Sequence, residues 1–381
     1  MVFYIRTVAS EDYGQLGRRI AEARQRAGHS QAGLALMVGL DRSALAKIEI
    51  GGRRVTALEL ARLAEALGER IEWFVNAPPP SIVSHRNLQT PGESESIIDR
   101  EVELAARDVE FLARHDAALR LAQAEVSPRP LAPAEAESLA LRARALLGLS
   151  PEEPVLEVAD RVASLGLIAF SFDLGPDAAD AASVLLPRGA VAVVNGGLHV
   201  GRRRLALVHE LGHYLVADEY TVDWRLSERG QDEISGENLI DRFARAVLLP
   251  AAGMEAAWSA DFRGGEELRS GAVKVASRFR VDMSTLSRRL AELRLLAGDA
   301  AGRIRGFRTT KADILEFGLV TREEFRSPGL STAYQESVLR LYRAEAISAA
   351  RALGLLRDTW TEEDLPDVPP SGEHAIWDFV S

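Results

Sequence analysis

The sequence predicts a mainly α-helical protein that contains one small β-sheet and is divided into two or three domains. Apolar residues recur at helical spacing along most of the chain, whereas short β-branched runs are confined to residues 166–195. A length of 381 residues is too great for one compact domain, and a hydrophobic content of 47% is enough to bury real cores.

The first 76 residues are predicted to form a series of short helices. Ser30 and Asp41 are suitable N-caps, and glycines follow the ends of the helical patterns. These signals place helices over 16–28, 31–38, 41–50 and 56–68, with a last apolar patch over 71–75. Three consecutive prolines at 78–80 then predict a linker.

The remainder alternates between helical patterns and one β-rich region. Residues 92–125 are charged and helical in pattern, prolines cluster at 128–133, and two amphipathic helices are predicted over 135–165. Strands are predicted over 166–174, 183–187 and 190–195. Helices resume at Arg203 and continue towards an acidic, proline-rich stretch at 357–381.

Composition excludes several classes of site. The chain has no cysteine, which rules out disulfides, a cysteine nucleophile and thiolate zinc sites, so a metal would need histidines and carboxylates. No apolar run approaches the eighteen residues that a membrane span requires, and the first residues lack the features of a signal peptide. We therefore expect a cytoplasmic protein without a membrane partner.

The net charge of −10 is unevenly distributed. Residues 1–76 contain 11 Lys/Arg and 9 Asp/Glu, a charge of +2, which leaves −12 on the rest of the chain. A near-neutral N-terminal module can bind DNA through one basic face even when the body of the protein is acidic.

Two of the N-terminal helices have the arrangement of a helix-turn-helix motif, whose second helix enters the major groove of double-stranded DNA. The pair is Gln31–Val38 and Asp41–Ile50, joined at Gly39-Leu40. The residues predicted to hold the two helices together are Leu34, Leu45 and Ile48. The outward face of the second helix is predicted to present Arg42, Ser43 and Lys47 to bases or phosphates, and Gln31 is placed to contact a phosphate. Spacing alone is equally compatible with a small helical bundle whose polar face contacts only water.

The stretch SQAGLALMVGLDRSALAKIEIGGRRVTALELARLAEAL resembles the Xre/lambda-repressor family, and the resemblance covers residues 16–76. It implies operator DNA as a partner and binding as a homodimer to two half-sites. Family members often carry a second glutamine at the start of the reading helix, where this chain has Asp41-Arg42, so the resemblance does not give a base preference.

A second motif, His209-Glu210-Leu211-Gly212-His213, matches H-E-x-x-H. Residues four positions apart share a helix face, so both imidazoles can bind one Zn²⁺. Glu210 is rotated by about 100° from His209 on the helix, which suits a general base beside the metal. Gly212 costs about 1 kcal/mol relative to alanine in a helix, which indicates close packing there.

A catalytic zinc needs a third protein ligand and an open position for water. The acidic residues downstream that could supply this ligand are Asp218, Glu219, Asp223, Glu228, Asp232, Glu233, Glu237 and Asp241. Glu237 is the preferred candidate because it opens a strongly amphipathic helix that Pro250 ends, and it shares one face with Asp241.

The order of these motifs resembles the ImmA/IrrE family of metallopeptidases over about residues 155–297. The similarity lies in a strand ending in Val-Val-Asn, then RRRLALVHELGHYLV, then E-x-x-I-D-R-F-A-R-A-V-L-L-P. It implies a thermolysin-like zinc peptidase domain of the gluzincin type, with Glu237 as the third ligand and Glu210 as the catalytic base. The family's usual alanine and asparagine are Ile240 and Asp241 here, and an extra acid beside zinc could change its affinity or the acidity of bound water.

Other features carry less functional weight. Residues 276–296 also read as a helix-turn-helix, with Arg288 and Arg289 expected to be exposed, although the resemblance implies a packing subdomain. His199 is expected in a surface turn, and the histidines expected to be solvated are His29, His85, His115 and His374.

Together these observations predict four segments. They are an Xre-type domain at 1–77, a linker and helix at 78–134, an ImmA/IrrE-like zinc peptidase domain at 135–297, and a helical C-terminal region at 298–381. The main hypothesis is a DNA-binding transcriptional regulator with a zinc metalloendopeptidase that cleaves a helix-turn-helix repressor or antitoxin-type partner. The resemblance implies stress response, mobile-element or toxin–antitoxin control. The alternatives are a DNA-binding regulator or antitoxin whose peptidase fold is a non-proteolytic sensor, and, less favoured, a zinc hydrolase of small molecules.

Overall fold

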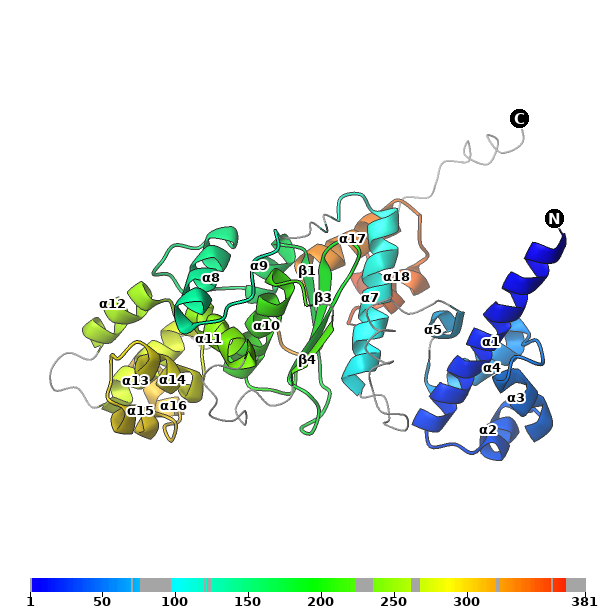
Figure 1. Ribbon diagram of the computed structural model, residues 1–381, viewed down its shortest axis with the longest axis horizontal. Helices are drawn as coiled ribbons and strands as arrows, with labels where there is room; N and C mark the ends of the chain where they lie inside the picture. The colour runs from blue at the N-terminus through cyan, green and yellow to red at the C-terminus, as the bar shows by residue number, and fades with distance from the viewer. Residues whose placement is uncertain are drawn as a thin grey trace. The chain divides into compact units, whose positions relative to one another are not determined.

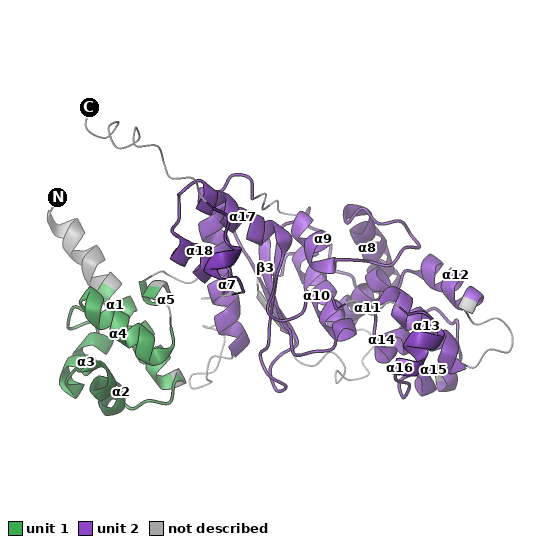
Figure 2. Cartoon of the chain, turned by 180° about the vertical axis from the view of Figure 1, so that it is seen from behind, with its two compact units in different colours: residues 1–79, 86–95 green, residues 80–85, 96–381 purple. Residues whose placement is uncertain are grey.

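The computed structural model describes residues 2–69, 71–75, 97–119, 121, 125–218, 220–223, 236–261, 268–319, 323–357 and 359–367. The chain separates into two compact units, one made of residues 1–79 and 86–95 and the other of residues 80–85 and 96–381 (Figure 2). The predicted mainly helical fold with one small sheet is confirmed. Within the described residues, no helix is both long and apolar enough to cross a membrane.

In the first unit, the described residues form a bundle of five helices: α1 (Val2–Arg26), α2 (Gln31–Val38), α3 (Arg42–Glu49), α4 (Ala57–Leu67) and α5 (Ile71–Val75). Helix α1 begins well before the predicted residue 16. The Ser30 hydroxyl accepts a hydrogen bond from the Gly33 amide and so caps α2, and Gly39 ends that helix in the left-handed conformation. Leu34, Leu45 and Ile48 are buried as predicted, so α2 and α3 form the expected pair.

The second unit contains a five-stranded sheet with the strand order β4-β2-β3-β1-β5. The three predicted strands are confirmed as β1 (Leu167–Phe172), β2 (Ala181–Leu185) and β3 (Ala190–Asn195). Strands β1 and β3 are parallel, and the other pairs are antiparallel. The edge strands β4 (Tyr220–Asp223) and β5 (Gly329–Leu330) were not predicted.

Helices cover both faces of this sheet, which explains why its strands read as nearly continuous apolar runs. Leu167 and Ala169 join the core shared with α9 (Val158–Ser164) and α10 (Val200–Leu215). Ile168 and Phe170 point to the other core, formed with α7 (Ile97–His115), α17 (Thr332–Arg343) and α18 (Ala349–Leu355). The three layers are visible in Figure 1. The helical C-terminal region therefore completes the second face of the sheet.

Further helices extend the unit beyond the α10 layer (Figure 1). They are α8 (Pro133–Leu146), α11 (Gly236–Leu248), α12 (Ala251–Asp261), α13 (Leu268–Phe279), α14 (Met283–Glu292), α15 (Gly298–Ile304) and α16 (Lys311–Glu316). A short 3₁₀ helix, η1, spans Glu362–Asp364. Helix α11 packs against both α8 and α10.

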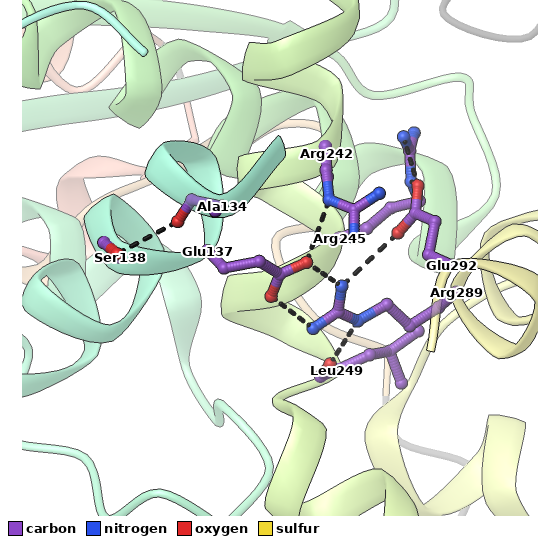
Figure 3. A network of polar contacts seen from close by, with 8 residues as sticks. All are labelled: Ala134, Glu137, Ser138, Arg242, Arg245, Leu249, Arg289 and Glu292. Atoms are coloured by element: carbon purple, nitrogen blue, oxygen red, sulfur yellow. Dashed lines mark hydrogen bonds and ion pairs between the residues drawn. The ribbon is translucent and has the colours of Figure 1, made fainter. Parts of the chain in front are cut away.

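The expectation that Arg289 is exposed on α14 is wrong, and Arg288 is only half-exposed. The guanidinium of Arg289 is fully buried and donates to both carboxylate oxygens of Glu137 on α8, at 2.6 and 2.8 Å, and to the Leu249 carbonyl (Figure 3). Arg242 of α11 also donates to Glu137. The polar face of α14 is therefore an internal contact between helices, as the packing-subdomain interpretation expected, and this buried arginine is not available to DNA.

Candidate functional site

Helix α10 positions the H-E-x-x-H motif in the interior of the second unit. Its sixteen residues pack between the sheet and α11, so nearly the whole helix is buried. His209 and His213 are 0% and 2% exposed, and their Nε2 atoms lie 2.9 Å apart. Two buried imidazoles that face each other this closely need a shared partner, because burying polar groups without one is costly.

Glu237, in the first turn of α11, supplies the third converging donor. Its Oε2 lies 3.5 Å from the Nε2 of His209 and 3.5 Å from that of His213. Tetrahedral zinc with ligands at about 2.0–2.1 Å separates its donor atoms by about 3.3 Å. The three side chains can therefore hold one metal ion, and two nitrogens with one oxygen suit Zn²⁺.

A carboxylate stands behind each imidazole. The Nδ1 of His209 lies 2.8 Å from the Oδ1 of Asp241, and the Nδ1 of His213 lies 2.7 Å from the Oδ2 of Asp218. When a metal binds, each ring would keep its proton on Nδ1 and offer the Nε2 lone pair to the ion. Such outer carboxylates orient metal-binding imidazoles and make them more basic.

The structure thus distinguishes among the acidic residues that could supply a third ligand. Asp218 and Asp241 face the Nδ1 atoms and so lie behind the histidines, whereas Glu237 faces both Nε2 atoms. Asp223 lies in β4, but its side chain is not described. The remaining competitors are outside the described residues: Glu219, Glu228, Asp232 and Glu233.

The charges at the centre stabilise one another. Hydrogen bonding to His209 and His213 holds the pKa of Glu237 well below its usual range, against the opposing effect of burial. Burial lowers the pKa of His213, but the bonds to Asp218 and Glu237 outweigh it, so the net shift is upward. Arg129 donates to Asp218 at 2.7 Å and lies 3.7 Å from Glu237. This guanidinium links the third donor to the carboxylate behind His213.

Glu210 is completely buried and lies on the sheet side of α10. The Ser183 hydroxyl on β2 donates a hydrogen bond to its Oε2. Ser183 is itself buried in the centre of the strand, so its position is fixed by the sheet. The sheet therefore holds the carboxylate next to the two histidines in a defined orientation.

Gly212 lies where α10 and α11 make contact. A Cβ there would lie 2.8 Å from the Cγ2 of Ile240 and 2.9 Å from the Cδ1 of Phe243, both too short for real contacts. The close packing expected at this glycine is confirmed. Because α11 carries Glu237 and α10 carries both histidines, this contact sets the spacing of the three donors.

The helix-turn-helix exposes the residues predicted to read DNA. Arg42, Ser43 and Lys47 are all exposed on α3, and no hydrogen bond or ion pair joins their side chains to other described residues. Gln31 is half-buried, and its amide donates to Glu49 at 2.8 Å. Glu49 in turn pairs with Arg24 of α1 at 2.6 Å. This buried network fixes α2 and α3 on α1, and a phosphate contact by Gln31 stays a prediction.

Two of the other described histidines follow the predictions and one does not. His199 and His115 are exposed, His199 at the N-cap of α10, whereas His29 is partly buried. His85 and His374 lie outside the described residues.

Sequence reasoning missed Ser183 and Arg129. Ser183 is 27 residues from Glu210, and Arg129 is 89 residues from Asp218. The only available signal at Ser183 was a polar residue inside an otherwise apolar strand, Ala-Ala-Ser-Val-Leu. In a strand buried on both faces such a hydroxyl needs a partner.

Two family models match the chain. The helix-turn-helix model matches residues 20–74, and the model of the IrrE N-terminal-like domain, of peptidase family M78, matches residues 167–291. Among solved structures, the restriction-modification controller protein C.AhdI from Aeromonas hydrophila is 36% identical. That match covers 17% of this chain and 97% of C.AhdI, with a TM-score of 0.17. No curated protein matches the chain. The chain therefore joins a DNA-binding helix-turn-helix domain of the Xre type to a metallopeptidase-type domain of the IrrE N-terminal-like family.

Proposed function

We propose that this protein is a transcriptional regulator that binds operator DNA and carries a zinc-dependent endopeptidase of the gluzincin type. The observation that carries the proposal is the convergence of His209, His213 and Glu237, with a carboxylate behind each histidine. A structural helix pair has no need for this set, because three buried or half-buried titratable groups would destabilise a fold that gains nothing from them.

His209, His213 and Glu237 would hold the metal, leaving a fourth position for water or substrate. The metal, when bound, acidifies water and polarises the scissile carbonyl. Glu210 would take the proton from the attacking water and pass it to the leaving amine. Ser183 orients Glu210 for that transfer by holding Oε2, and Asp218 accepts the Nδ1 proton of His213. The Asp241 carboxylate, 2.8 Å from the Nδ1 of His209, attracts the proton on that ring.

We propose that the substrate is a protein rather than a small molecule, and specifically a helix-turn-helix repressor or antitoxin-type partner. The support is the fusion itself, because a DNA-reading domain in the same chain brings the peptidase to the place where such a partner acts. Cleavage of a repressor is a switch that suits stress response or control of mobile elements and toxin–antitoxin loci.

DNA reading is assigned to α3 of the first unit. Arg42 and Lys47 present charged groups from the exposed face of a helix that its neighbours hold rigidly. Arginine and lysine suit guanine edges and phosphates, whereas Ser43 is a permissive reader. One such helix buries little surface, so we expect a homodimer on half-sites about 10 base pairs apart or a multiple of that.

The test combines metal analysis with a cleavage assay. Purified protein should contain about one zinc per chain, and His209→Ala, His213→Ala and Glu237→Ala should each lose it. Wild-type protein is then incubated with repressors encoded beside it, and fragments are identified by mass spectrometry. Zinc binding without cleavage of any such repressor would favour the alternative, a non-proteolytic sensor. Retention of zinc by the Glu237→Ala variant would show that the third ligand is misassigned.

A further inference from the structure

A cavity lies beside the proposed metal centre, and its arginines have no role in the proposed mechanism. It is a partly open cavity of about 240 Å³ where the N-terminal ends of α10 and α14 meet α11. Its walls include three arginines, one from each of these helices: Arg202, Arg245 and Arg288. The volume is below the roughly 300–1,000 Å³ of pockets for drug-sized ligands, so its occupant must be small.

The acidic residues that line the cavity face other partners. Asp282 caps α14 by accepting hydrogen bonds from the Thr285 amide, at 2.8 Å, and the Thr285 hydroxyl, at 2.9 Å. Asp241 lies 2.8 Å from His209. Arg202 and Arg245 are held in place by carboxylates outside the lining, Asp180 and Glu292 respectively. Arg202 and Arg245 are thus fixed in orientation before a ligand arrives.

The local electrostatics favour a negative ligand. Burial lowers the pKa of Arg288, and so do the positive charges of Arg245 and Arg305, whereas Asp241 and Glu292 oppose them less strongly. Burial disfavours any charge there, but the two neighbouring guanidinium groups make the surroundings of Arg288 attractive to an anion. Guanidinium groups also recognise carboxylate and phosphate with specific geometry.

We propose that this cavity is a site for a small organic anion carrying a carboxylate or phosphate group, and that its occupant strengthens metal binding at the adjacent centre. Asp241 makes the connection, because it lines the cavity and also faces the Nδ1 of His209. An anion that binds Arg288 weakens the attraction between Arg288 and Asp241. The Asp241 carboxylate then interacts more strongly with His209, which makes that imidazole a better metal ligand. The coupling rests on the proposed metal centre, but anion binding does not.

Anion binding is tested by calorimetry on full-length protein freed of zinc, at constant ionic strength. Sulfate is the probe for phosphate-type ligands and succinate the probe for carboxylates, so the tighter of the two identifies the class. We expect saturable binding to one site per chain. The Arg288→Gln variant should bind the anion about tenfold or more weakly, as expected when a hydrogen bond to a charged group is removed. Arg278→Gln, which changes an exposed arginine on α13 outside the cavity, should bind like wild type.

A second variant guards against a folding defect in Arg288→Gln. Ser284→Glu places a carboxylate in the cavity and should abolish sulfate and succinate binding while the protein stays folded by circular dichroism. An equal loss in Arg278→Gln and Arg288→Gln would show non-specific charge attraction and overturn the proposal. So would the absence of saturable binding of both probes to the wild type.

Coupling is tested by measuring zinc affinity through competition with a chromophoric chelator, with and without saturating sulfate. We expect wild-type affinity to rise about fivefold or more, the range of typical coupling between sites, and Arg288→Gln to show no rise. An unchanged zinc affinity in the wild type would overturn the coupling. If sulfate binds the cavity but zinc binds under neither condition, the proposed peptidase fails while the anion site stands.

Discussion

Replacing Gly212 by alanine should weaken metal binding about 10–100-fold while it costs the fold at most about 2 kcal/mol. The added Cβ would lie 2.8 Å from Ile240 and 2.9 Å from Phe243, and both residues are fully buried. Ordinary carbon contacts lie at about 3.5–4.0 Å, so α10 and α11 must separate locally by about 0.7–1 Å. Ile240 is β-branched and cannot turn away cheaply.

The effect on stability is the balance of two terms. Alanine gains about 1 kcal/mol over glycine in a helix, and overpacking a core costs about 1–3 kcal/mol. The metal-free variant should therefore lose only about 0–2 kcal/mol of unfolding free energy. Metal sites tolerate changes in ligand distance of only about 0.2 Å, so displacing Glu237 from the histidines should lower zinc affinity about 10–100-fold.

The assay is zinc competition against a chromophoric chelator, combined with urea unfolding of the metal-free protein. Gly302→Ala is the matched control, because a Cβ on this α15 glycine meets nothing within 4 Å. The control should gain about 0.5–1 kcal/mol of stability and bind zinc like wild type. Wild-type zinc affinity in Gly212→Ala would refute the argument that this contact sets the spacing of the donors.

Four other outcomes are expected. Glu210→Gln should keep zinc and the fold, but its cleavage rate should fall about 10²–10⁴-fold, because an amide cannot accept the proton. The rate is measured on a substrate that the wild-type protein cleaves. Undiminished cleavage would remove Glu210 from the mechanism. Zinc affinity should fall as the pH decreases, because His213 must be deprotonated to bind. Because the pKa of His213 is raised above its ordinary value of 6.5, the fall in zinc affinity should begin above pH 6.5. The measurement is competition with a chelator from pH 5 to 9. Arg42→Ala should weaken operator binding by about 1–3 kcal/mol and should relax specificity at one operator position in a binding selection. If Lys47 contacts phosphate, Lys47→Ala should weaken binding to all DNA sequences alike. Selection of the same operator by a variant lacking residues 1–76 would show that the DNA-reading residues lie elsewhere in the chain.

The parts of the candidate site that lie on one helix could be predicted from the sequence. Helical periodicity places His209 and His213 on one face of α10, and it places Glu237 and Asp241 on one face of α11. Periodicity could not decide which of the two acids faces the Nε2 atoms, because that depends on how α10 and α11 cross. The preference for Glu237 agrees with the geometry of the structure, while its role as a ligand stays a prediction.

The parts of the fold that depend on distant contacts could not be predicted. Strand β5 has two residues and forms only because β1 offers it an edge. Ser183 contacts Glu210 across the interface between the sheet and α10, which no local pattern reveals. Arg289 was expected at the surface because polar faces of amphipathic helices usually meet water. In this protein a second helix, α8, brings Glu137 onto that face instead.

The ion pairs that bury Arg289 also bear on the metal centre. Glu137 of α8 binds Arg289 of α14 and Arg242 of α11 at the same time, and Glu292 of α14 binds Arg245 of α11 at 2.7 Å (Figure 3). Helix α11 is therefore fixed by α8 and α14 on one side and by the close contact at Gly212 on the other. Removing one partner of a buried pair leaves an uncompensated charge, which costs about 3–5 kcal/mol. Helices α8 and α14 thus form the support that holds Glu237 opposite the two histidines, and Glu137→Gln, which removes the partner of Arg289 and Arg242, should lower zinc affinity in chelator competition even though all three donors remain.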